Sequence, residues 1–140
     1  MTNDPTTSNS SNEPRHVLVV EDDVPLLHMA SKILERAGYR VTQARTAEEA
    51  LLAVRPPARF HLLFTDVVMP GRTGLELASL LRANHPTLGI LLTTGQFDAE
   101  VRRSVERSGH HVLRKPYTAQ DLCDAALVAM STPDVDGPAT

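Results

Sequence analysis

The chain has 140 residues, of which 41% are hydrophobic, and this size and composition fit one domain with a single core. Its formal net charge is −3 and only 4% of its residues are aromatic, so it lacks the basic, aromatic-rich surface expected for direct nucleic-acid binding. The single cysteine, Cys123, excludes a disulfide framework and a cysteine-based zinc site.

Small polar residues and proline dominate the two ends of the chain. Residues 1–14 contain almost no apolar side chains and residues 131–140 are similar, so both are predicted to be flexible tails around one domain at 15–130. The start of the chain also lacks the features of a signal peptide, and no run of about 18 apolar residues occurs. We therefore expect a soluble cytoplasmic protein that does not associate with membranes.

The domain begins with two strand-helix units. Residues 17–20 are continuously apolar, as in a buried strand, and apolar residues at helical spacing follow over 26–37, where a glycine ends the pattern. Residues 39–43 alternate like an edge strand. Thr46 and Glu49 then have the spacing of a capping box, which predicts the start of a second helix.

Three further units repeat this alternation. The expected strands and helices are, in order, residues 62–65, 75–84, 88–93, 98–108, 112–113 and 118–129. Five consecutive βα units predict a parallel sheet with helices on both faces. The predicted fold is therefore a flavodoxin-like (βα)5 three-layer α/β sandwich with strand order 2-1-3-4-5.

Carboxylates follow the first and third strands of this predicted sheet. In the 2-1-3-4-5 order the strand order reverses between these two strands, and ligands bind beyond the carboxyl ends there. Glu21, Asp22 and Asp66 would meet at this point, and so many oxygen ligands suit Mg²⁺, with Mn²⁺ as an alternative. Thr94 and Lys115 follow the next two strands and suit phosphoryl oxygens, so the set favours phosphoryl transfer to Asp66. Asp23 is expected to cap the first helix.

At these same strand ends the chain resembles the receiver domain of two-component response regulators. The resemblance is carried by VLVVEDD (17–23), TDVVMPGRTG (65–74), LLTTG (91–95) and RKPY (114–117). It implies that Asp66 is the phosphoacceptor, that Asp22 binds Mg²⁺ directly and that Glu21 binds it through water. The backbone carbonyl of Val68 would be a further ligand.

The resemblance also assigns residues that would handle the phosphoryl group. Thr94 would donate a hydrogen bond to it and Lys115 would pair with it. The peptide bond before Pro116 is expected to be cis. Gly74 matches a turn glycine of the family, for which we expect a positive φ.

Three positions depart from features that the resemblance leads one to expect. Many family members have an aromatic switch residue where this chain has Val112, so coupling of the site to the neighbouring surface is expected to be weaker or differently built. Val68 and Gln96 flank the expected path of the hydrolytic water, and neither offers a base. Both are therefore expected to influence the lifetime of the phosphoryl group.

The resemblance implies a stand-alone receiver that acts as a phosphorylation switch. Its expected donor is a sensor histidine kinase or a histidine phosphotransfer protein, and its output would be protein contact, homodimerisation or phosphorelay. It would not be an enzyme acting on other substrates, because it would catalyse only its own phosphorylation and autodephosphorylation.

Two other functions require residues that this sequence lacks, and a third remains open. A haloacid-dehalogenase-type phosphatase needs a second Asp two residues after the nucleophile, and Val68 stands there. A nucleotide-binding domain would need a glycine-rich loop after the first strand, which is missing. A pseudo-receiver, which keeps the fold as an interaction module without phosphorylation, remains open from the sequence.

Overall fold

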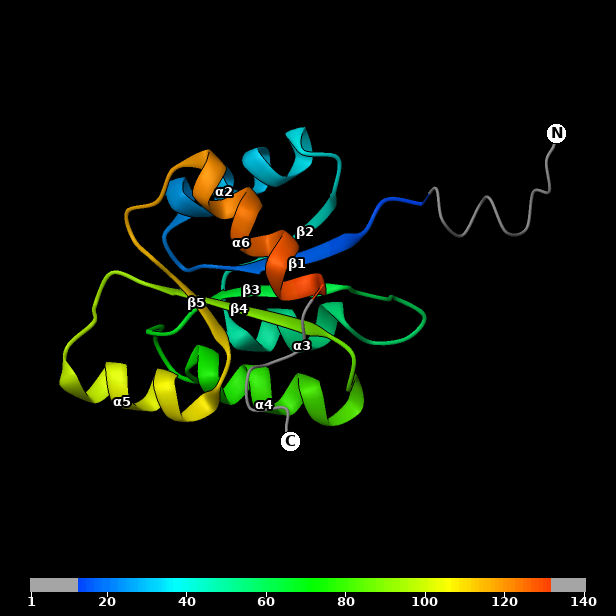
Figure 1. Ribbon diagram of the computed structural model, residues 1–140. Coiled ribbons are helices and arrows are strands. Elements are labelled where there is room, and N and C mark those ends of the chain that lie inside the picture. The colour runs from blue at the N-terminus through cyan, green and yellow to red at the C-terminus, as the bar shows by residue number, and fades with distance from the viewer. Residues whose placement is uncertain (1–12, 132–140) are drawn as a thin grey trace, which may run out of the picture.

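The computed structural model describes residues 13–131, which form a five-stranded parallel sheet with helices on both faces (Figure 1). The strands in chain order are β1 (His16–Val20), β2 (Arg40–Ala44), β3 (Leu62–Asp66), β4 (Gly89–Thr94) and β5 (His111–Arg114). They pair in the order β2-β1-β3-β4-β5, and every pair is parallel. The flavodoxin-like fold and the strand order predicted from the sequence are confirmed.

Five helices complete the three layers. They are α2 (Val24–Arg36), α3 (Ala47–Ala53), α4 (Gly74–Asn84), α5 (Ala99–Ser108) and α6 (Ala119–Ser131). Helices α2 and α6 cover one face of the sheet, while α3, α4 and α5 cover the other (Figure 1). None of the helices among residues 13–131 is long and apolar enough to span a membrane.

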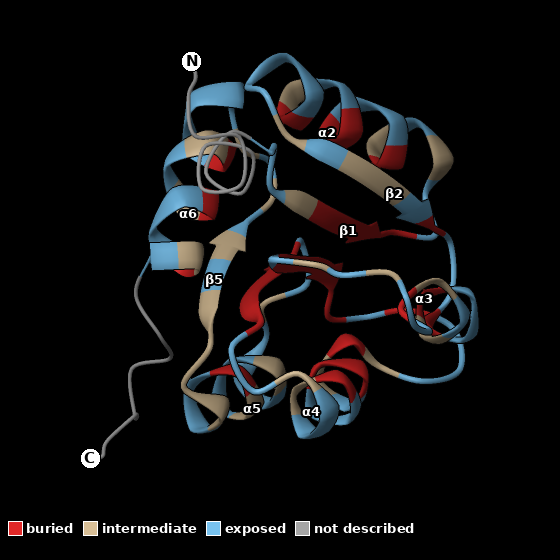
Figure 2. Cartoon of the chain, turned by 90° about the vertical axis from the view of Figure 1, so that its right-hand side faces the viewer, coloured by how far each residue is buried: buried red, intermediate tan, exposed pale blue. Residues whose placement is uncertain are grey.

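The sheet separates two hydrophobic clusters because successive side chains of a strand point to opposite faces. Val17 and Val19 of β1 pack on the α2 and α6 side, whereas Leu18 and Val20 pack on the α3 and α4 side. Strands β3 and β4 are buried along their whole length, but the edge strands β2 and β5 are mostly half-buried or exposed (Figure 2). The continuous apolar runs in the sequence thus correspond to the strands at the centre of the sheet.

Capping interactions set where the first helices begin. Asp23 caps α2 as predicted, since its Oδ1 accepts a hydrogen bond from the backbone N of Leu26 at 3.1 Å. Thr46 caps α3, and its Oγ1 accepts from the backbone N of Glu49 at 3.0 Å. The predicted capping box is incomplete, however, because Glu49 Oε1 accepts from the backbone N of Arg45, at 2.8 Å, one residue before the cap.

The predicted tails fall almost entirely outside the described residues. Residues 1–12 and 132–140 are not described, so the prediction of flexible ends at 1–14 and 131–140 stays a prediction there. Ser131 is the last residue of α6, one position beyond the predicted end of the domain. Two peptide bonds among residues 13–131 are cis, Pro56–Pro57 and Lys115–Pro116, and the second was expected from the sequence.

Candidate functional site

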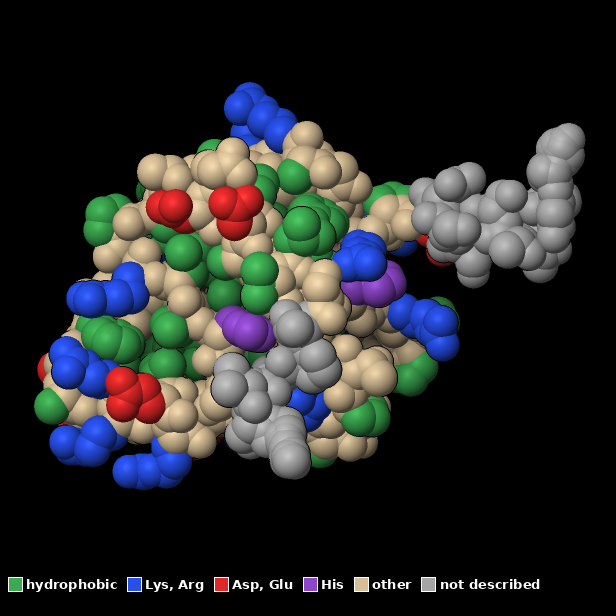
Figure 3. Space-filling view, in the orientation of Figure 1, with side chains coloured by type: hydrophobic (Ala, Val, Ile, Leu, Met, Phe, Trp, Pro, Cys, Tyr) green, Lys and Arg blue, Asp and Glu red, His purple; other side chains and the backbone are tan. Residues whose placement is uncertain are grey.

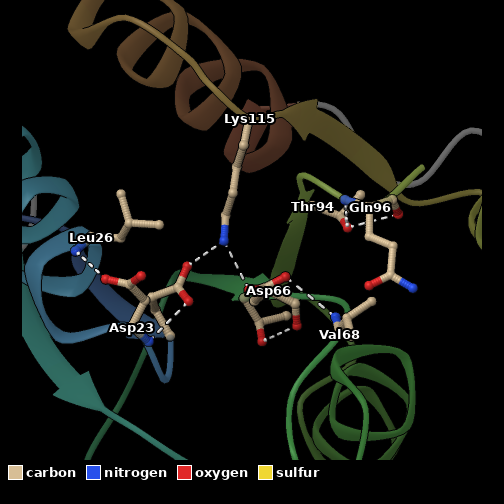
Figure 4. Close-up of polar contacts among 9 residues, drawn as sticks. Asp23, Leu26, Asp66, Val68, Thr94, Gln96 and Lys115 are labelled. Atoms are coloured by element: carbon tan, nitrogen blue, oxygen red, sulfur yellow. Dashed lines mark hydrogen bonds and ion pairs between the residues drawn. The ribbon is translucent and has the colours of Figure 1, made fainter.

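Polar side chains gather at the carboxyl edge of the sheet, where four parallel strands end (Figure 4). Glu21 and Asp22 follow β1, and Asp66 is the last residue of β3. Thr94 ends β4 and Lys115 follows β5. The structure therefore places all five residues predicted for the site at one edge, because the carboxyl ends of parallel strands lie together.

Asp66 is the centre of this arrangement. Its side chain is almost fully buried, and its Oδ2 accepts a hydrogen bond from Lys115 Nζ at 2.9 Å. The same ammonium group lies 2.8 Å from Glu21 Oε1, so one lysine bridges two buried carboxylates. Asp66 Oδ1 accepts a hydrogen bond from the backbone N of Val68 at 3.3 Å, which ties the carboxylate to the segment that follows β3 (Figure 4).

The pKa shifts of Glu21 and Lys115 reflect two carboxylates held close together. Burial raises the pKa of Glu21, and the nearby charge of Asp66 raises it further, although Lys115 opposes both. Burial lowers the pKa of Lys115, but its hydrogen bonds to Glu21 and Asp66 outweigh burial and leave the pKa raised. Burial beside these groups also raises the pKa of Tyr117 to about 12. The site thus favours a positive charge between its carboxylates.

The carboxylates fit a divalent cation. One oxygen from each of Glu21, Asp22 and Asp66 can be chosen so that all lie within 4.8 Å of one another. Two of these side chains are buried, whereas Asp22 is exposed and can reach an ion from the solvent side. An all-oxygen donor set with room for water is what Mg²⁺ prefers. The residues present therefore fit the ion predicted from the sequence.

Thr94 is bonded within its own loop rather than to the carboxylate cluster. Its Oγ1 accepts from the backbone N of Gln96 at 3.0 Å and donates to the backbone O of the same residue, also at 3.0 Å (Figure 4). The backbone O of Thr94 in turn accepts from the backbone N of Lys115 at 3.0 Å. The β4–α5 loop and the lysine of the site are therefore joined through one residue.

A family model described as "Response regulator receiver domain" matches residues 17–127, which is most of the chain. The chain belongs to this family. Receiver domains of response regulators are signalling switches of two-component systems that respond to phosphorylation, and they are generally not enzymes. The resemblance seen in the sequence motifs is confirmed.

Curated relatives and solved structures agree with this assignment. The receiver domain is 37% identical over 109 residues to "Two-component response regulator ORR27" of Oryza sativa, covering 76% of this chain and 17% of that protein. It is 33% identical over 114 residues to "Response regulator receiver protein CpdR" of Brucella abortus, covering 77% of this chain and 90% of CpdR. The chain spans 17%, 47% and 24% of the length of the first three curated relatives.

The fold is also that of solved receiver domains. A CheY-like receiver domain protein from Methanospirillum hungatei matches with a TM-score of 0.77 and 27% identity, covering 84% of this chain and 94% of the other. The receiver domain of NtrX from Brucella abortus matches with a TM-score of 0.74 and 30% identity, covering 83% of this chain and 98% of the other.

The three positions expected to influence coupling and the lifetime of the phosphoryl group lie at the surface. Val68 is 40% exposed and Gln96 is exposed, and both stand beside the carboxylate cluster in Figure 4. Val112 is 36% exposed on the edge strand β5. None of these side chains is needed to fill the core, so their identity can be changed with little effect on folding.

Gly74 plays a different structural role from the one predicted. The positive φ angles among the described glycines belong to Gly38, Gly71 and Gly109, so the expected positive φ at Gly74 is wrong. Gly74 is instead the first residue of α4, and a Cβ there would overlap the backbone carbonyl oxygen of Asp66. The receiver requires glycine at this position because the helix approaches the end of β3 closely.

Phe97 also lies beside the site, although no role was predicted for it from the sequence. Phe97 lies in the β4–α5 loop, directly after Gln96, and the guanidinium carbon of Arg114 is 4.5 Å from the centroid of its ring. The guanidinium carbon of Arg102 on α5 is 5.5 Å from the same centroid. An aromatic residue in an otherwise polar loop was the available signal, but its partners are distant in sequence.

Proposed function

We propose that Asp66 accepts a phosphoryl group from the phosphohistidine of a sensor histidine kinase or a histidine phosphotransfer protein, in a Mg²⁺-dependent reaction. The observation that carries the proposal is the burial of the Asp66 carboxylate against one ammonium group and two further carboxylates. Such a site offers a nucleophilic oxygen, a cation for phosphoryl oxygens and oxygen ligands for a metal.

The transfer itself needs no other nucleophile. An oxygen of Asp66 attacks phosphorus while the bond from phosphorus to the imidazole nitrogen breaks. That nitrogen keeps the electron pair, and the imidazole leaves neutral because its other nitrogen carries a proton. When bound by Asp22, Asp66, the carbonyl of Val68 and, through water, Glu21, Mg²⁺ would neutralise charge on the phosphoryl oxygens and carboxylates.

Two residues would change partners on phosphorylation. Lys115 would exchange its contact with the Asp66 carboxylate for the new phosphoryl oxygens, which carry more negative charge. Thr94 would exchange its bonds with Gln96 for a hydrogen bond to the phosphoryl group. The second exchange would rearrange the β4–α5 loop, which is the conformational change of the switch.

Output is proposed to be protein contact, homodimerisation or phosphorelay. A cytoplasmic location and the absence of direct nucleic-acid binding stay predictions for this chain.

The pseudo-receiver remains the alternative outcome of the phosphorylation test. That test is incubation with Mg²⁺ and acetyl phosphate followed by intact-mass measurement, and a phosphoryl adduct that needs the metal supports the proposal. No adduct with or without Mg²⁺ would instead support the pseudo-receiver.

Val68 is expected to control how long the phosphoryl group survives. Replacing Val68 with Asn places an amide beside the path of the attacking water. The amide is no base, but it would hydrogen-bond to the water and orient it, so dephosphorylation should be about tenfold faster, less than the 10²–10⁴-fold that a positioned general base supplies. The measurement is the decay of the phosphoryl adduct by intact mass after acetyl phosphate is removed. Val68→Ile is the matched control, since it keeps an apolar side chain, and equal decay rates for both variants would contradict the prediction.

Phe97 is expected to carry the signal from the loop to β5, in place of the aromatic residue that Val112 replaces. Rearrangement of Gln96 must move the neighbouring Phe97 and therefore its ring contact with Arg114. Phe97→Leu should allow phosphorylation but reduce the phosphorylation-dependent change in the amide chemical shifts of β5, measured by NMR. Val112→Ile, which keeps the ring contact, should retain the full change. A phosphorylation-dependent change in Phe97→Leu as large as in the wild type would exclude this route.

A further inference from the structure

The opposite edge of the sheet, formed by the amino ends of β2, β1 and β3, carries a second cluster of polar side chains. Arg40 begins β2 and His16 begins β1, and the two residues pair in register. His61 immediately precedes β3, and its backbone N donates to the backbone O of His16 at 2.8 Å. This edge takes no part in the site at Asp66, which lies at the carboxyl end of the same strands.

A cavity of about 540 Å³ opens at this edge. Its charged and titratable lining residues are Glu13, His16, Arg40, Arg55, Arg59 and His61. Figure 3 shows Lys or Arg and His side chains side by side where the described chain begins. A chain of net charge −3 therefore has a cavity lined by three guanidinium groups and a single carboxylate. A cavity lined by one sign of charge concentrates the opposite charge inside it.

The three arginines have no carboxylate partner among residues 13–131. The ion pairs of this part of the chain involve Arg72 and Lys115, and none includes Arg40, Arg55 or Arg59. One guanidinium group can bind two oxygens of a phosphate through two parallel N–H donors. These three donors are thus available to an anion in the cavity.

His16 and His61 also line the cavity, and hydrogen bonds fix which ring nitrogen of His61 can donate. His61 Nδ1 accepts a hydrogen bond from the backbone N of His16 at 2.9 Å, so the proton of the neutral ring is on Nε2. The His16 ring is held by the backbone O of Arg59 and by Thr42 Oγ1, at 3.1 and 2.7 Å. Burial lowers the pKa of both imidazoles, and the charges of Arg40 at His16 and of Arg15 and Arg59 at His61 lower it further. The positive charges of these arginines therefore act on both imidazole rings.

We propose that this cavity binds the diphosphate group of a small molecule, through Arg40, Arg55, Arg59 and the Nε2–H of His61. Three guanidinium charges against Glu13 leave a net charge of about +2, which matches a diphosphate better than a single phosphate. The volume is in the range of small-molecule sites and exceeds what one phosphate fills. This site is independent of phosphorylation at Asp66.

The test is an NMR titration of the full chain in EDTA, which reads the imidazole signals of His16 and His61. Pyrophosphate should shift both signals in a saturable manner, and inorganic phosphate should bind more weakly. A parallel titration with ADP distinguishes the source, because tighter binding than pyrophosphate assigns a nucleoside diphosphate and weaker binding assigns the free anion. Either order supports a diphosphate site.

Two double variants distinguish binding in this cavity from nonspecific attraction of the anion to any arginine on the surface. Arg55→Gln with Arg59→Gln should weaken pyrophosphate binding at least about tenfold, since each loses charge-assisted hydrogen bonds. Arg103→Gln combined with Arg107→Gln, on exposed positions of α5, removes the same charge and should change binding less than twofold. The proposal is overturned if pyrophosphate shifts neither histidine, if both double variants weaken binding equally, or if phosphate binds as tightly as pyrophosphate.

Discussion

Asp66→Asn is expected to abolish the phosphoryl adduct that forms with Mg²⁺ and acetyl phosphate. An amide has almost the shape of the carboxylate and can still accept from the backbone N of Val68, but it lacks the charged oxygen that attacks phosphorus. It also weakens the metal site, because one of three carboxylates is lost. Intact-mass measurement under identical donor and metal concentrations checks the result, and the loss should be complete within detection.

A matched control is available two residues beyond Glu21. Asp23 lies in the β1–α2 loop together with Glu21 and Asp22, but its carboxylate caps α2. Asn is as good an N-cap as Asp, so Asp23→Asn should keep both the fold and the phosphoryl adduct. An adduct that persists at the wild-type level in Asp66→Asn would mean that another residue accepts the phosphoryl group. Loss of the adduct in both variants would point to the total negative charge around the site rather than to Asp66 as the acceptor.

Gly74→Ala is expected to lower the free energy of unfolding by about 1–3 kcal/mol, the usual cost of overpacking. The added Cβ would overlap the carbonyl oxygen of Asp66, and a backbone carbonyl cannot rotate away as a flexible side chain could. The backbone N of Gly74 donates to the carbonyl of Val67 at 2.9 Å, so relief of the overlap also strains this bond. Because the displaced atoms belong to the phosphoacceptor strand, adduct formation should be slower as well.

Gly95→Ala is the control for this substitution. A Cβ at Gly95 would meet only the Lys115 side chain, at 3.6 Å, which is an ordinary van der Waals contact. Its effect on stability should stay within about 0.5 kcal/mol. Urea unfolding of both variants and the wild type measures the difference. A Gly74 variant as stable as the Gly95 variant would show that α4 can move away from β3 at no cost.

The sequence alone predicted the fold and the composition of the candidate site. Continuous apolar runs such as 17–20 and 62–65 indicate strands buried on both faces, and helical periodicity between them indicates the covering layers. Since the carboxyl ends of parallel strands share one edge, the residues that follow each run could be assigned to one site without coordinates. Asp66 and Lys115 are separated by 49 positions, yet both follow from this rule.

Tertiary structure alone decided how residues contact one another across strands and loops. The need for glycine at 74 comes from the approach of α4 to the Asp66 carbonyl, and the Phe97–Arg114 contact joins a loop to an edge strand. The basic cavity at the opposite edge gathers His16, Arg40 and Arg59 from three separate segments. Periodicity records which side of an element is buried, but it does not record which distant side chain or backbone atom meets it there.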